Sequence, residues 1–177
     1  HHGAVGTPWI PEHFFRKAET GGGAVVDLGA HPLYISMLLH GGPPDSVAAR
    51  IGYVSAREVE DNAALVLDYP DGVLGVAEMS MVASYMGYSI EVVGTGGTIV
   101  VGPADTRVLL RGTQDDVWHE QRLSEPGPDP FHQWVDWVVS GESDPSHLPL
   151  VRDVTRGIEA AYRSAETGSV VALAELS

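Results

Sequence analysis

The sequence predicts an α+β fold with an open, mostly antiparallel sheet of about six strands and helices on one face. Short stretches of alternating apolar and polar residues, separated by turn sequences, fill the middle of the chain. Apolar residues at helical spacing lie on either side of this region. Because the expected strands follow one another through short hairpin connections, the sheet should be largely antiparallel.

Length and composition limit the classes of protein. The 177 residues suffice for one domain, and we expect residues 1–177 to form it. The 24 acidic and 10 basic residues give a net charge of −14, which argues against binding to nucleic acid or an anionic membrane. The chain has no cysteine, no 18-residue apolar stretch and no signal-peptide pattern, so we expect a cytoplasmic protein.

The first long helix is expected to begin after three glycines at residues 21–23 and to stop at residues 41–44. Its apolar composition indicates a largely buried helix. Asp27 and His31 are four residues apart, which places both side chains on one face if the segment is helical. Pro32 should kink the helix just after His31, because proline cannot donate a backbone hydrogen bond.

Asp27 and His31 are the candidate site, because a polar group in a buried helix needs a partner or a function. Two alternatives stay open. Asp27 could stabilise the free N–H groups at the start of the helix, with His31 a hydrogen-bonded core histidine. The kink could instead turn His31 toward a cleft. We expect no metal site, since no second histidine or paired carboxylate at ligand spacing accompanies them.

Aromatic and imidazole side chains gather just before the glycines, around a short helix expected at residues 12–19. They could form the wall of a ligand pocket or cover the edge of the core. We name Trp9, His13 and Tyr34 as candidate substrate-binding residues.

Alternating apolar and polar side chains predict the strands in turn. They are expected at residues 46–56, 62–69, 73–80, 88–93, 98–101, 107–111 and 117–123. The four residues 94–97 are rich in glycine and resemble a phosphate-binding loop. They lie between two strands, however, whereas such a loop needs a helix N-terminus, so a hairpin turn is expected.

Two amphipathic helices are expected after a proline-rich break at residues 125–130, the first around residues 131–138 and the second at residues 148–165. His132 and Asp136 repeat the four-residue spacing of the candidate site. Apolar periodicity already explains this helix, so we interpret the two as an exposed face. A last short strand is expected near the C-terminus.

Several segments resemble the C-terminal domain of the Gfo/Idh/MocA family, the relatives of glucose-fructose oxidoreductase and inositol dehydrogenase. They are residues 21–32, 59–63, 69–72, 91–97 and 157–168. The resemblance extends over about residues 9–173. It implies an open sheet like that of the C-terminal domain of glyceraldehyde-3-phosphate dehydrogenase. It also implies a two-domain enzyme whose Rossmann domain is absent from this chain.

The resemblance implies the substrate domain of an NAD(P)-dependent oxidoreductase that transfers hydride between a nicotinamide and a sugar, polyol or related secondary alcohol. It assigns catalytic roles to Asp27 and His31. His31 would take the hydroxyl proton, and Asp27 would orient the imidazole or bind a neighbouring hydroxyl. NAD or NADP would be bound mainly by the absent domain, whose lysine often shares proton transfer. Lys17, the sole lysine here, matches no such segment, so the chain alone should be inactive.

The open sheet carries a second expectation. If its outer face stays apolar through Val66, Val76 and Val92, that face should pair with another subunit in a homodimer or tetramer. The alternative from another class of protein is a noncatalytic assembly or ligand-binding module that lacks a cofactor domain.

Overall fold

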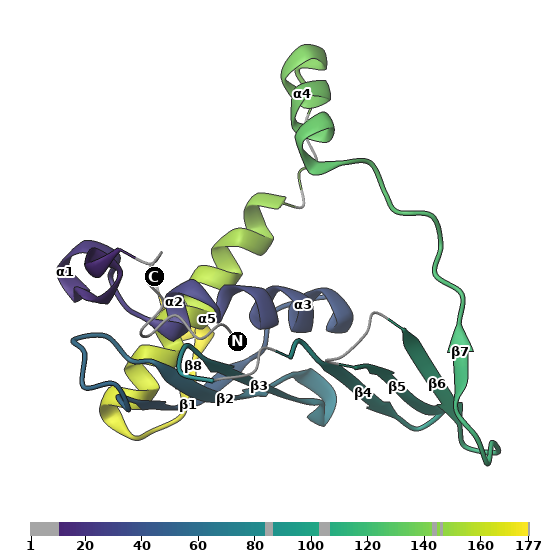
Figure 1. Ribbon diagram of the computed structural model, residues 1–177, viewed down its shortest axis with the longest axis horizontal. Helices are drawn as coiled ribbons and strands as arrows, with labels where there is room; N and C mark the ends of the chain where they lie inside the picture. The colour runs from purple at the N-terminus through teal and green to yellow at the C-terminus, as the bar shows by residue number, and fades with distance from the viewer. Residues whose placement is uncertain (1–10, 84–86, 103–106, 143–144, 146, 177) are drawn as a thin grey trace. The chain divides into compact units, whose positions relative to one another are not determined.

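The computed structural model describes residues 11–83, 87–102, 107–142, 145 and 147–176 (Figure 1). The chain divides into two compact units: His1–Tyr85 with Pro145–Ser177, and Met86–Asp144. The α+β class is confirmed, and every described strand pair is antiparallel. The strands form two four-stranded sheets, however, where one sheet of about six strands was predicted. Alternation indicates that a segment is a strand but not which strand is its neighbour.

The sheet of the first unit has the order β3-β2-β1-β8. Its strands are β1 (Ser46–Gly52), β2 (Asn62–Asp68), β3 (Leu74–Ser80) and β8 (Val171–Ala172). The register places Leu65 opposite Ala49 on one side and Ala77 on the other. All three are buried, because alternate side chains of a strand point to the same face. That face forms one half of the core.

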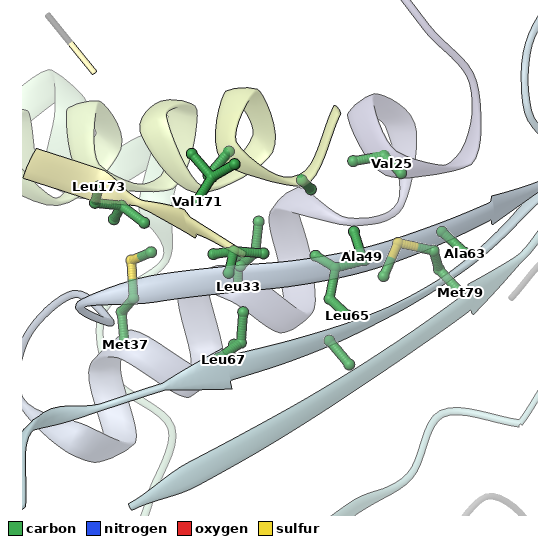
Figure 2. Close-up of a cluster of buried hydrophobic side chains, with 14 of the residues drawn as sticks. Val25, Leu33, Met37, Ala49, Ala63, Leu65, Leu67, Met79, Val171 and Leu173 are labelled. Atoms are coloured by element: carbon green, nitrogen blue, oxygen red, sulfur yellow. The ribbon is translucent and has the colours of Figure 1, made fainter. Parts of the chain in front are cut away.

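Helices α2 (Ala24–Asp27), α3 (Ala30–His40) and α5 (His147–Thr167) supply the other half of the core. Figure 2 shows Val25, Leu33 and Met37 packed over the side chains of the strands. On α5, Ser164 is buried and its hydroxyl accepts a hydrogen bond of 2.9 Å from the Ala49 N–H. This bond fixes α5 against β1.

The expected first helix is broken at Leu28–Gly29, and the helical segments on either side are bent by 42°. The predicted kink after His31 is therefore wrong. Pro32 is the third residue of α3, where a backbone N–H has no partner within the helix in any case. A Cβ at Gly29 would overlap the Val25 carbonyl oxygen, so the chain passes close to itself at this break.

The start of α2 is held by a buried carboxylate. Glu60, just before β2, is 2% exposed. Its Oε1 accepts hydrogen bonds from the Gly23 N–H (2.9 Å), the Val25 N–H (3.0 Å) and the Tyr162 hydroxyl (2.6 Å). A Cβ at Gly22 would overlap the Tyr162 hydroxyl, and one at Gly23 would overlap the Glu60 carbonyl oxygen. Only glycine leaves room for this approach.

Strand β1 ends at Gly52, before the end of the strand expected at residues 46–56, because the Asp61 carboxylate binds the segment that follows. This carboxylate accepts hydrogen bonds from the backbone N–H groups of Val54 (3.0 Å) and Ser55 (2.5 Å) and from the Asn62 side chain (2.7 Å). Burial of Asp61 opposes its ionisation, but the hydrogen bonds from Ser55, Val54 and Asn62 outweigh burial and lower its pKa. The segment after β1 therefore turns, where the sequence predicted a continuing strand.

The second unit contains β4 (Ile90–Gly94), β5 (Gly97–Val101), β6 (Val108–Gly112), β7 (His119–Gln121) and α4 (Pro130–Ser140). Gly94 pairs with Gly97, so the predicted hairpin turn is confirmed. The Asp129 side chain caps α4 by accepting the Phe131 N–H at 2.9 Å. His132 and Asp136 are both exposed on α4, as expected.

Three short 3₁₀ segments complete the described chain together with α1 (Lys17–Thr20). They are η1 (Glu12–Phe15), η2 (Pro70–Gly72) and η3 (Leu173–Glu175).

Over the described residues, no single helix is long and apolar enough to cross a membrane. The bent pair Lys17–Asp27 and Ala30–His40 would suffice by length and composition alone, and it carries the core residues Val25, Leu33 and Met37.

We predict that Gly23→Ala lowers the free energy of unfolding by about 2 to 3 kcal/mol, because the added methyl group must displace the Glu60 backbone. The control is Gly42→Ala, since the space around Gly42 is open. It should leave stability unchanged or raise it by up to about 1 kcal/mol. Urea denaturation followed by circular dichroism measures both. Equal effects would contradict the close packing at Gly23.

Candidate functional site

A cavity of about 300 Å³ opens beside α2 in the first unit. It is lined by Phe14, Thr20, Gly22, Val26, Asp27 and Met81. The wall therefore combines η1, α1, the glycine segment before α2, the end of α2, and the residue that follows β3. Asp27 is the one ionisable group among these lining residues. A single carboxylate beside apolar side chains suits a small ligand with both a polar and an apolar side.

The wall that carries Phe14 is anchored by the segment after β1. The Arg57 guanidinium forms an ion pair with Glu12 and lies 4.8 Å from the centre of the Phe15 ring. The Lys17 N–H donates to the Glu58 carboxylate at 3.2 Å. These contacts hold η1 and the start of α1 in place beside the cavity.

Asp27 and His31 lie on opposite sides of the helix break. Asp27 is the last residue of α2, and its N–H donates to the Gly23 carbonyl oxygen at 2.9 Å. His31 is the second residue of α3 and does not line the cavity. Both side chains are exposed, so the expectation that they are buried in one helix is wrong. The core alternative for His31 is excluded by the same observation, because Leu33 and Met37 form the buried face of α3.

The other predicted site residues are only partly brought together. His13 is exposed in η1, with its ring centre 5.0 Å from that of Phe14, but Phe14 lines the cavity and His13 does not. Tyr34 is exposed on α3, three residues after His31. Trp9 lies outside the described residues. The roles assigned to all five residues stay predictions.

Sequence reasoning missed several parts of this site. Phe14 was within the aromatic segment that we singled out, so its signal was present. Met81 and Thr20 carried no signal, since a lining position depends on tertiary packing. Glu60 and Tyr162 were also missed. The neighbouring carboxylates at residues 60 and 61, next to an apolar strand, were the available hint.

Below the cavity, the electrostatics keep Tyr162 as a hydrogen-bond donor. Burial, the hydrogen bond to Glu60 and the negative charge of that carboxylate raise the pKa of the phenol well above its ordinary value of 10.0. The hydroxyl therefore keeps its proton and donates a hydrogen bond to Glu60 Oε1. Asp27 is the ionisable group that lines the cavity, whereas Glu60 is buried.

Comparison with known proteins identifies the family. The model of the GFO/IDH/MocA C-terminal domain matches residues 1–100, and the chain belongs to this family. The resemblance stated from the sequence is thereby confirmed. No curated protein matches the sequence.

Solved structures share the fold at low sequence identity. Aldose-aldose oxidoreductase from Caulobacter crescentus, complexed with glycerol, has a TM-score of 0.76 at 22% identity, over 92% of this chain and 52% of its own. Levoglucosan dehydrogenase in complex with NADH and levoglucosan has a TM-score of 0.76 at 18% identity, over 92% and 53%. An oxidoreductase from Agrobacterium radiobacter, in complex with NAD⁺, L-tartaric acid and magnesium, has a TM-score of 0.69 at 23% identity, over 88% and 51%. The chain thus spans about half the length of these relatives.

We predict that His31→Gln changes the free energy of unfolding by less than about 0.5 kcal/mol, because the imidazole is on the surface. Leu33→Ala, two residues further on the same helix, should cost about 2 to 5 kcal/mol, because Leu33 is fully buried. Thermal and urea denaturation measure both changes. A large loss of stability in the His31 variant would restore the core interpretation.

Proposed function

We propose that the chain is the substrate domain of a cytoplasmic NAD(P)-dependent oxidoreductase. The intact protein would transfer hydride between a nicotinamide and a sugar, polyol or related secondary alcohol. The observation that carries the proposal is the exposed Asp27 carboxylate at a cavity, with exposed His31 just across the helix break, in a member of this family. Solved relatives in complex with NADH and levoglucosan, or with glycerol, support the choice of cofactor and substrate class.

The cofactor would be bound mainly by another part of the intact protein. Across the residues that the structure describes, the Gly94–Gly97 turn joins two strands, so it offers no helix N-terminus to a pyrophosphate. The cavity beside Asp27 is of a size for a small ligand or one end of a larger one. When bound, the nicotinamide of NAD or NADP supplies the hydride acceptor.

This chain's own residues would bind and deprotonate the alcohol. His31 in its neutral form takes the hydroxyl proton on the imidazole nitrogen. Asp27 accepts a hydrogen bond from the same or a neighbouring hydroxyl. Phe14, Val26 and Met81 contact the carbon side of the substrate, and His13, Tyr34 and Trp9 contribute further binding groups.

A noncatalytic assembly or ligand-binding module is the second candidate. The observation that favours it is that the cavity beside Asp27 is not lined by His31, the proposed base. The same cavity would then bind a ligand without hydride transfer. The two candidates differ in whether the polypeptide includes a strand, a glycine-rich turn and a helix that together bind a dinucleotide.

We predict that the intact protein reduces NAD⁺ or NADP⁺ with at least one alcohol from a panel of sugars and polyols. His31→Asn should lower kcat by about 10² to 10⁴-fold, because the general base is lost. The control is His132→Asn, an exposed histidine of α4. An unchanged kcat in His31→Asn, with chemistry rate-limiting, would argue against His31 as the base.

The outer faces of both sheets support a homodimer or tetramer. On β2 and β3, Val66 and Val76 are opposite one another and are 41% and 78% exposed. On β4 and β5, Val92 and Ile99 form a similar exposed pair. Apolar cross-strand pairs on an outer face are typical of subunit interfaces.

We therefore predict that the wild-type protein sediments as a dimer or tetramer at micromolar concentration and that Val76→Glu shifts it toward the monomer. A buried carboxylate at the interface would have no partner. Val54→Glu, at an equally exposed position in the turn after β1, serves as control and should leave the assembly unchanged. A monomeric wild type in sedimentation velocity would refute the interface.

A further inference from the structure

A buried polar group lies directly behind the cavity, and the mechanism above does not use it. Glu60 is 2% exposed and is not among the residues that line the cavity. A buried carboxylate is costly unless it is well hydrogen-bonded. Its contacts therefore indicate what this charge stabilises.

Glu60 binds three backbone N–H groups in the segment that leads to Asp27. Oε1 accepts the Gly23 N–H at 2.9 Å and the Val25 N–H at 3.0 Å, and the Glu60 carbonyl oxygen accepts the Ala24 N–H at 2.9 Å. Three successive N–H groups are thus bound by one residue. Hydrogen bonds to a charged acceptor are the stronger kind.

The same oxygen is fixed from the opposite side by α5. The Tyr162 hydroxyl donates to Glu60 Oε1 at 2.6 Å and lies so close to Gly22 that no Cβ would fit. Gly22 itself lines the cavity. Tyr162 therefore contacts a residue of the cavity wall, although it is not itself a lining residue.

Helix α2 has only four residues and cannot hold its own orientation, because a single helical turn is not stable alone. Its first N–H groups are fixed from outside, and its last residue is Asp27. We infer that Glu60 is a positioning residue for Asp27 and this cavity wall, and that Tyr162 orients the Glu60 carboxylate. The inference rests on the proposed function for its kinetic consequence only.

Two variants and one control separate positioning from general stability. Tyr162→Phe removes one hydrogen bond to Oε1 and keeps the ring. Glu60→Gln keeps a side chain of the same shape with one acceptor oxygen and removes the negative charge. Ser164→Ala is the control, since it removes a buried hydrogen bond between the same helix and Ala49 of β1.

The kinetic test uses the intact enzyme with an alcohol substrate and its preferred nicotinamide. Tyr162→Phe and Glu60→Gln should lower kcat/KM by about 10 to 100-fold, mostly through kcat, because a small displacement of a catalytic group is costly. Ser164→Ala should stay within about twofold of the wild type. Equal effects of Tyr162→Phe and Ser164→Ala would overturn the inference.

A second measurement needs no activity. In the ligand-free intact protein, amide hydrogen exchange at Asp27, Leu28 and Gly29 reports on α2, because these N–H groups bond to Gly23 and Ala24. Exchange there should accelerate in Tyr162→Phe and Glu60→Gln but not in Ser164→Ala. Unchanged exchange in the first two would overturn the inference. If no alcohol is oxidised but exchange accelerates as expected, the proposed function fails and the positioning of α2 stands.

Discussion

One buried carboxylate oxygen connects three parts of the first unit that are far apart in the sequence. Glu60 joins the segment before β2 to the start of α2 and to Tyr162 in the C-terminal half of α5. The desolvation of that charge is offset by its three donors. Gly22 and Gly23 are required for the same reason, since the backbone must approach both Tyr162 and Glu60.

The candidate site lies at the break between α2 and α3, and the packing of the core requires this break. Val25 and Leu33 pack into the same core from α2 and α3, and the break between them lets each helix follow the sheet separately. Asp27 is thereby brought to the surface at the end of one helix, and His31 at the start of the next. The polar groups are exposed because the buried positions of both helices are already occupied by apolar side chains.

Much of the fold was predictable from local patterns. Residues 62–68 and 74–80 alternate apolar and polar side chains, and α5 carries its apolar residues at helical spacing, so these elements were found nearly at their observed bounds. The break at Leu28–Gly29 was not predicted, because it depends on how closely Gly29 approaches Val25 and Met79 in the folded chain. Asp27 was named from the sequence, whereas the cavity beside it includes Met81, whose place is a property of the folded chain.

The cavity is built from two kinds of wall. Gly22 and Val26 belong to a segment that is tied into the core through Glu60. Phe14 and Thr20 belong to η1 and α1, whose one buried residue is Phe15 and whose anchors are the exposed contacts of Arg57 and Glu58. Apart from Phe15, residues 11–20 can accordingly be substituted with little repacking of the sheet, so this wall of the cavity can change shape while the inner framework stays the same.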